Sequence, residues 1–115
     1  MSSDQDSSSA APDLTGKPLE ISRARNGDAV VVSLSGELDL ATADDVAGVI
    51  RDLEESQDSR IVIDLSDLAF IDSTGLQALL TAKSRNNGRL AFTPSEHDAV
   101  TRLFAMTHTD ELLGL

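Results

Sequence analysis

The alternation of apolar and polar residues divides most of the chain into β-prone runs and amphipathic segments. The first two β-prone runs, "LEISRA" and "VVVSLSGEL", are separated by a segment that contains Asn26-Gly27. Both residues of this pair tolerate positive φ, so the pair is a strong hairpin signal. The sequence therefore predicts two antiparallel strands at the start of the folded region.

A helical period follows in "TADDVAGVIRDLEES". Its apolar residues recur at positions i, i+3, i+4 and i+7, which places them on one helical face. These residues are Val46, Val49, Ile50 and Leu53. Thr42 and Asp45 form a pattern like a capping box, and the early acidic residues suit the positive end of the helix dipole. The pattern predicts a helix over about residues 42–56.

A continuous apolar run, "RIVIDL", comes next and indicates a strand that is covered on both faces or lies in a parallel sheet. After "SDLAFID" the helical period returns and continues to Asn87-Gly88, a common signal for the end of a helix. "RLAFT" then predicts another strand, which Pro94 would end.

Ser95 and Asp98 form a second capping-box pattern, which predicts a last helix that continues to about Thr107. The apolar residues of this helix are Val100, Leu103 and Phe104. The final residues, "DELLGL", fit either an edge strand or a helical turn.

The elements thus follow the order β-β-α-β-α-β-α, with a short terminal element. Strands that alternate with helices predict right-handed crossovers and an α/β fold with a mostly parallel sheet, in which the first strand is an antiparallel edge. Residues 17–115 are expected to form this single domain. Residues 1–16 are rich in Ser and Asp with almost no apolar side chain, which predicts a disordered acidic tail.

Composition narrows the class of protein. The chain has 115 residues, which suits one domain, and a net charge of −11 from 20 acidic and 9 basic residues. An acidic chain with only three aromatic residues repels phosphate backbones and offers few stacking platforms, so direct nucleic acid binding is not expected. The absence of cysteine removes disulfides and thiolate chemistry. With no apolar run near the roughly 18 residues that span a bilayer, and no signal-peptide pattern, we expect a soluble cytoplasmic protein without a membrane partner.

The strand-to-helix junction "IDSTGL" carries the clearest candidate chemistry. In an open α/β sheet, ligands and chemistry collect at the carboxyl edge of the strands, where this junction and "GELDLAT" would both lie. Asp39 and Asp72 are therefore predicted to be neighbours on one rim, with Ser73 between Asp72 and the start of a helix.

The residues alone leave several interpretations of Ser73 open. One is the N-cap of the following helix. A hydrolase nucleophile is disfavoured, because the G-x-S-x-G elbow needs glycine where this chain has Ile71, and because neither His97 nor His108 has an obvious carboxylate to orient it. A kinase substrate also fits, since the free N–H groups and the dipole of a helix N-terminus stabilise a phosphate group.

Asp64 is a weaker candidate, as a phosphoacceptor of the response-regulator kind. That chemistry needs an acidic pair to hold a metal and a lysine after a late strand, whereas the last lysine of this chain, Lys83, lies in a predicted helix. Asp64 and Asp67 are better interpreted as turn-forming, solvated residues.

Three segments, "GELDLATADDV", "IVIDLSDLAFIDSTGLQALL" and "HDAVTRLFAM", together resemble a STAS domain of the bacterial anti-sigma factor antagonist family. The resemblance runs from about Leu19 to the C-terminus, and its most specific part is D-S-[ST]-G-L, here residues 72–76. Typical members have glycine shortly after the third helix, where this chain reads "MTHTDELLGL" with His108 near the turn, and they carry a further C-terminal helix.

The resemblance implies a partner switch in which this chain catalyses nothing and needs no metal or cofactor. Family members bind an anti-sigma factor that is also a serine kinase, and so release the sigma factor. The kinase phosphorylates the serine that matches Ser73, which lowers the affinity, and a metal-dependent serine phosphatase restores it. By the same resemblance, Asp39, Asp72, Thr74 and Gly75 help to form the docking rim. The alternative is a STAS scaffold or ligand-sensing module that is never phosphorylated.

Overall fold

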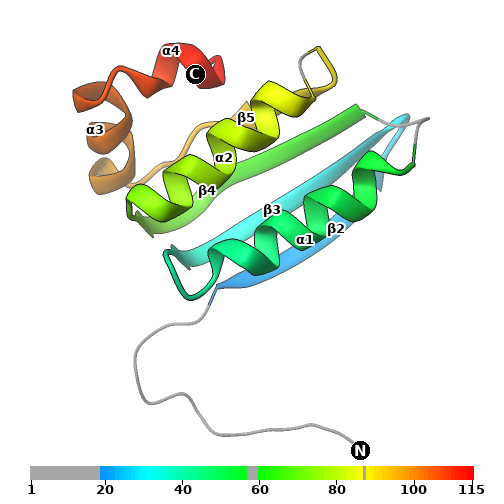
Figure 1. Cartoon of the computed structure of the whole chain (residues 1–115), viewed down its shortest axis with the longest axis horizontal. Coiled ribbons are helices and arrows are strands. Elements are labelled where there is room, and N and C mark those ends of the chain that lie inside the picture. The colour runs from blue at the N-terminus through cyan, green and yellow to red at the C-terminus, as the bar shows by residue number, and fades with distance from the viewer. Residues whose placement is uncertain (1–18, 57–59, 87) are drawn as a thin grey trace, which may run out of the picture.

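The computed structural model describes residues 19–56, 60–86 and 88–115, and within them four strands form one mixed sheet in the order β2-β3-β4-β5 (Figure 1). The strands are β2 (Glu20–Asn26), β3 (Ala29–Leu38), β4 (Arg60–Ile71) and β5 (Leu90–Thr93). β2 pairs antiparallel with β3, whereas β3 with β4 and β4 with β5 pair in parallel. The predicted α/β fold, the hairpin and the antiparallel edge strand are confirmed. The predicted acidic tail, residues 1–16, lies outside the described residues.

The helices of the described part pack against this sheet. They are α1 (Ala43–Glu54), α2 (Ser73–Arg85), α3 (Asp98–Met106) and α4 (Thr109–Leu113). α1 and α2 lie side by side across one face of the sheet, and α3 stands at the end where β3 and β4 finish (Figure 1). Of the two alternatives for the last residues, an edge strand and a helical turn, the structure shows the helical turn, which is α4. None of the described helices combines the length and the apolar character needed to cross a membrane.

The core lies between the helices and one face of the sheet. Alternate residues of β3 and β4, such as Val32, Leu34 and Ile63, are fully buried. The residues between them, such as Val31 and Asp64, face the opposite side and are partly exposed, as the period of two in a strand requires. The run "RIVIDL" therefore lies in a parallel sheet, and the other alternative, a strand covered on both faces, is wrong for the described part of the chain.

β4 is longer than the apolar run that predicted it, because it continues to Ile71. Its register against β3 shifts at two places, between Ser33 and Ser35 and between Gly36 and Glu37, and β4 contributes the extra residue each time. The first shift turns Leu68 to the core face, and the second restores the alternation of the first half of the strand. Ile71 therefore faces the core, as Ile61 and Ile63 do, while its neighbour Phe70 remains 45% exposed.

The second predicted capping box is wrong in detail. α3 begins at Asp98 with His97 at the N-cap position, so Ser95 precedes the cap by two residues. The Ser95 hydroxyl is buried, donates to Leu68 O at 2.9 Å and accepts from His97 N at 2.9 Å. Ser95 thus ties the loop before α3 to β4 instead of capping the helix.

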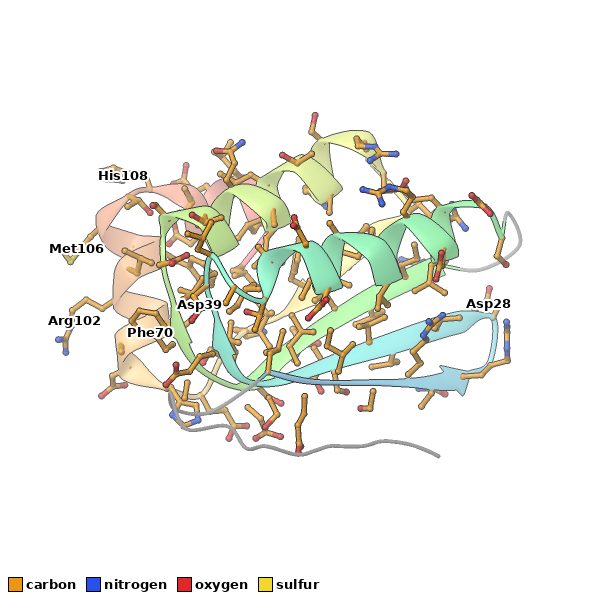
Figure 2. The ribbon with its side chains drawn as sticks, turned by 60° about the horizontal axis from the view of Figure 1, so that its bottom comes forward. Asp28, Asp39, Phe70, Arg102, Met106 and His108 are labelled. Carbon is orange, nitrogen blue, oxygen red and sulfur yellow. The ribbon has the colours of Figure 1, made fainter. Side chains whose placement is uncertain are left out.

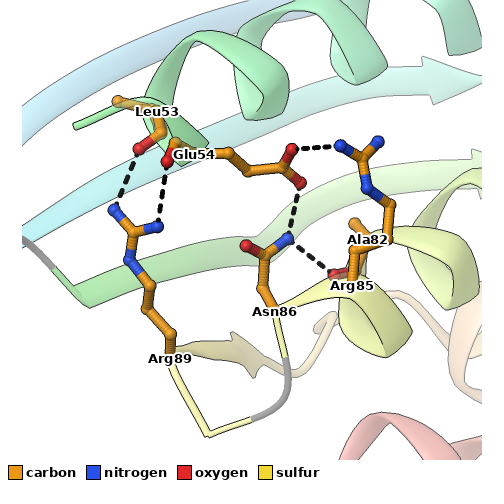
Figure 3. A network of polar contacts seen from close by, with 6 residues as sticks. All are labelled: Leu53, Glu54, Ala82, Arg85, Asn86 and Arg89. Carbon is orange, nitrogen blue, oxygen red and sulfur yellow. Dashed lines mark hydrogen bonds and ion pairs between the residues drawn. The ribbon is translucent and has the colours of Figure 1, made fainter. Parts of the chain in front are cut away.

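A polar network joins the C-terminal ends of α1 and α2 (Figure 3). The Glu54 carboxylate accepts from Arg85 Nη2 and from Asn86 Nδ2, each at 2.6 Å. Arg89 donates to the backbone oxygen of Glu54 at 3.3 Å. Because Asn86 is only 8% exposed, its side-chain amide depends on these protein partners, and the network fixes the spacing of the two helices at this end.

Candidate functional site

The loops that follow β3 and β4 meet at the carboxyl edge of the sheet. Asp72 N donates to Leu38 O at 3.1 Å, and Leu40 N donates to Asp72 Oδ2 at 3.2 Å. These bonds connect the Asp39 loop directly to the start of α2. The predicted proximity of Asp39 and Asp72 on one rim is therefore confirmed.

Asp72, and not Ser73, is the N-cap of α2. Its backbone is extended, and its Oδ1 accepts from Gly75 N at 2.9 Å. Since the other carboxylate oxygen accepts from Leu40 N, both oxygens of Asp72 are used to hold the junction together. The interpretation of Ser73 as the N-cap is wrong, because the carboxylate one residue earlier has taken that role.

Ser73 is the first residue of α2, and its side chain is exposed. Its hydroxyl makes no hydrogen bond to any of the described residues. The backbone N–H groups in the first turn of a helix lack intrahelical partners. Ser73 thus presents a free hydroxyl beside a helix N-terminus, while Thr74 next to it is half-buried.

Gly75 is buried where α2 crosses the end of β3. A Cβ atom at this position would lie 2.6 Å from Leu38 O and 2.7 Å from Leu38 Cγ. The absence of a side chain therefore allows α2 to approach β3 closely, and the junction depends on glycine for packing. Gly75 offers no exposed side chain to a partner, and its contribution to the rim is to position Ser73 and Thr74.

Asp39 organises the loop between β3 and α1. Its Oδ1 accepts from Ala41 N at 3.0 Å and from Thr42 N at 3.2 Å. Thr42 Oγ1 donates to Glu37 O and accepts from Asp39 N, each at 3.0 Å. Thr42 is the N-cap residue of α1, but its side chain makes no capping bond, so the predicted box with Asp45 is wrong.

Ser73 lies at one end of an open groove of about 560 Å³ between α1 and α2. The middle of the groove is lined by small side chains, among them Ala43, Ala47 and Ala78, and Arg51 and Arg85 also line it. Both helices start at the carboxyl edge of the sheet (Figure 1), which puts Ser73 near the first turn of α1.

The other candidates for chemistry do not join this site. Asp64 and Asp67 both lie within β4, so the prediction that they form a turn is wrong; Asp64 Oδ1 accepts from Ser66 N at 3.0 Å where the register of the strand shifts. His97 and His108 precede α3 and α4, and neither lines the groove at Ser73. Among the described residues, no group of three His, Asp or Glu side chains could hold a metal ion.

Sequence reasoning missed a set of exposed apolar residues near the rim. Leu40 is 73% exposed in the loop after β3, and Met106 is 70% exposed at the end of α3. Phe70 precedes Asp72 by two residues and lies on the opposite face of β4 from Ile71. The sequence signal for Leu40 was an apolar residue inside a predicted turn, and the signal for Phe70 was the period of two that puts Ile63 and Ile71 on one face of the strand and Phe70 on the other.

Comparison with known proteins agrees with this geometry. The family model described as "Mlab, STAS domain" matches residues 21–114 of this chain. The anti-sigma-F factor antagonist RsfB of Mycobacterium tuberculosis (strain ATCC 25618 / H37Rv) is 29% identical over 93 residues, which cover 81% of this chain and 73% of RsfB.

Solved structures share the fold. The crystal structure of an anti-sigma factor antagonist from Mycobacterium paratuberculosis is similar with a TM-score of 0.74 and 25% identity, covering 82% of this chain and 81% of that chain. The anti-sigma factor antagonist SpoIIAA in its unphosphorylated form is similar in fold, with a TM-score of 0.61 and 21% identity, covering 83% of this chain and 84% of that chain. With a matching family model over most of its length, this chain belongs to the STAS domain family.

Proposed function

We propose that this chain is an anti-sigma factor antagonist that binds a kinase-type anti-sigma factor, frees the sigma factor, and is switched off by phosphorylation of Ser73. The similarity to RsfB supports the antagonist class. The proposed partners are the serine kinase and a metal-dependent serine phosphatase that reverses the modification. Because sigma factors act in the cytoplasm, the proposal places this chain there.

The observation that carries the proposal is the free, exposed hydroxyl of Ser73 at the start of α2. Asp72 caps the helix, so the Ser73 hydroxyl has no structural bond to give up when another protein's active site engages it. A phosphate on Ser73 would lie beside unpaired N–H groups and the positive end of the helix dipole. We therefore expect the fold to stay the same when Ser73 is phosphorylated.

The switch would act through the bulk and the charge that a phosphate adds to the surface. Phosphorylation adds a charge of about −1.5 to −2 near pH 7. This charge appears next to the Asp72 carboxylate and at the end of the groove that Asp44 also lines. A partner that docks on an already acidic rim would meet added bulk and altered charge at that point, and its affinity would fall.

In this proposal the chain is a substrate and a binding partner rather than an enzyme. Of the described residues, none places a base within hydrogen-bond distance of the Ser73 hydroxyl. The kinase would have to supply the base, the ATP site and the metal. Asp39, Asp72, Thr74 and Gly75 would shape the rim that presents Ser73 to it.

The test is a phosphorylation assay with the cognate kinase-type anti-sigma factor and ATP, read by intact mass and by peptide mapping. We expect one phosphate on the wild-type chain and none on Ser73→Ala, while Thr74→Ala is modified as the wild type is. If Ser73→Ala accepts phosphate as fast as the wild type, the assignment to Ser73 is wrong. If Thr74→Ala alone abolishes the reaction, Thr74 is the acceptor.

The alternative function is a STAS module that is not phosphorylated and senses a ligand or joins a scaffold. Such a module would place its ligand or its neighbour in the open groove between α1 and α2. A module of this kind would remain unmodified by any kinase-type anti-sigma factor and would be recovered from its cells in a larger assembly. The same phosphorylation assay therefore separates the two functions.

A further inference from the structure

Most of the strongly exposed large apolar residues in the described part of the chain lie at one end of the molecule. The exposed fractions are 73% for Leu40, 45% for Phe70, 70% for Met106 and 63% for Leu112. Figure 2 shows Phe70 and Met106 at the end where Asp39 lies, which is the carboxyl edge of the sheet. Leu112 differs, since it lies with Lys83 and Ser84 near the other end of α2.

The fold holds these side chains outward. Leu40 belongs to the loop whose backbone is fixed to the N-cap of α2, because Leu40 N donates to Asp72 Oδ2 at 3.2 Å. Phe70 pairs with Glu37 near the end of β4, and its ring lies on the face of the strand opposite to Ile71, which enters the core. Leu40, which is bonded to Asp72, and Phe70, two residues before Asp72, thus present two large apolar side chains on backbone held by hydrogen bonds.

α3 extends the same surface. Arg102 and Met106 are four residues apart and therefore share one helical face, and Figure 2 shows both projecting from α3 next to Phe70. Met106 is flexible and adapts to a partner's shape, as methionines at binding surfaces commonly do. We name Leu40, Phe70 and Met106 the apolar patch.

Carboxylates lie close to the residues of the apolar patch along the chain. Those nearest in the chain are Glu37, Asp39, Asp67 and Asp72. The chain as a whole carries a net charge of −11, and Arg102 is a cation at the edge of the patch. A complementary partner would present an apolar centre with basic residues around it, because opposite potentials across an interface steer association and exclude wrong partners.

We infer that the apolar patch is the centre of the surface that binds the kinase-type anti-sigma factor, which docks with an apolar surface ringed by Lys and Arg. The inference rests on the proposed function and adds to it the residues that carry the affinity. Large apolar side chains near the middle of an interface contribute most of its binding energy, while the surrounding charges set the rate and specificity. Ser73 would lie at the margin of this surface, where the bulk and the hydration of a phosphate keep the partner from closing on the apolar patch.

The experiment measures the Kd of the purified anti-sigma factor kinase, held with ADP, for the wild-type chain and for Leu40→Ser, Phe70→Ser and Met106→Ser. Leu112→Ser is the matched control, because it removes an equally exposed leucine away from the rim. We expect Leu40→Ser and Phe70→Ser each to raise the Kd by about tenfold or more, and Leu112→Ser to raise it by less than about threefold. Raising NaCl from about 0.05 M to about 0.5 M should weaken wild-type binding, because exposed charges are screened.

The outcomes separate the inference from the function on which it rests. If Leu40→Ser and Phe70→Ser bind as tightly as the wild type while Ser73 is still phosphorylated, the inference is overturned and the proposed function stands. A loss of affinity in Leu112→Ser as large as that in Leu40→Ser would also overturn the inference. If the wild-type chain neither binds the kinase nor is phosphorylated by it, both are overturned. Leu40→Ser should unfold at the same temperature as the wild type, because the Leu40 side chain is largely in solvent. A loss of affinity in this variant can therefore be assigned to the lost contact and not to misfolding.

Discussion

Gly75 and Leu38 are in direct contact at the point where α2 crosses the end of β3, and a Cβ on Gly75 would lie 2.6 Å from Leu38 O. Backbone atoms at this distance cannot move aside without disturbing the parallel ladder between β3 and β4. The same contact brings Ser73 to the rim shared with Asp39. Packing in the core and presentation of the candidate phosphorylation site therefore depend on one glycine.

Gly75→Ala should destabilise the fold by about 1–3 kcal/mol, because the added methyl group overpacks a buried contact. Urea unfolding measures the change. Gly48→Ala in α1 is the matched control, since a Cβ there meets nothing within 4 Å and alanine favours a helix over glycine by about 0.5–1 kcal/mol. Equal effects of the two substitutions would show that the contact with Leu38 is not tight.

Asp72→Ala should lower the free energy of unfolding by about 0.5–2 kcal/mol, because Gly75 N loses its capping acceptor. Asp72→Asn keeps an oxygen at the same place, and asparagine caps helices about as well as aspartate. Its loss should therefore be smaller in the same unfolding experiment, although its amide nitrogen cannot accept from Leu40 N as Asp72 Oδ2 does. If both variants lose the same amount, the bond from Leu40 N or the charge of Asp72 matters more than the capping bond.

Ser73→Asp should leave the free energy of unfolding within about 0.5 kcal/mol of the wild type. The Ser73 side chain is exposed, and a negative charge in the first turn of a helix is favourable. The same variant should bind the kinase-type anti-sigma factor more weakly, because the added carboxylate takes up space in the interface and must lose water there. A loss of stability as large as that of Asp72→Ala would mean that the Ser73 hydroxyl supports the fold.

Glu54→Ala should cost about 1–3 kcal/mol of stability, because it leaves the buried amide of Asn86 without its carboxylate partner. Thermal unfolding measures the loss. The control is Asp52→Ala, which removes an exposed ion pair with Arg23 at 3.8 Å and should cost less than about 0.5 kcal/mol. A small effect of Glu54→Ala would show that water replaces the carboxylate at Asn86.

His108→Gly should stabilise the chain by a few tenths to about 1 kcal/mol. His108 has a φ of 59°, in the left-handed region, where a side chain costs roughly 1–2 kcal/mol and glycine does not. Part of this gain is lost because glycine makes the unfolded chain more flexible. Gly114→Ala provides the opposite change at a φ of 76° and should destabilise. A lower melting temperature for His108→Gly would mean that the histidine side chain makes a compensating contact.

The local pattern was sufficient to predict the elements that bury one regular face. In α1 the spacing of Val46, Ile50 and Leu53 placed all three in the core. The hairpin was predicted at the right place, although its turn residues are Gly27 and Asp28, and of the predicted pair Gly27 alone has a positive φ, of 66°. The capping patterns at Thr42 and Ser95 gave wrong predictions. Thr42 Oγ1 donates to Glu37 O in β3 and Ser95 Oγ donates to Leu68 O in β4, and no capping pattern predicts these bonds.

The sequence by itself determined the order of the elements, the mixed sheet and the position of Ser73 at a strand-to-helix junction, because periodicity and turn chemistry are local properties. The tertiary structure decided that Asp72 caps α2 and leaves the Ser73 hydroxyl free, since the cap is held by a bond from Leu40 in another loop. It also decided that Phe70 remains 45% exposed, because the sequence pattern gives the face of a strand but not what covers that face. Contacts between residues far apart in the chain set which side chains a partner can reach.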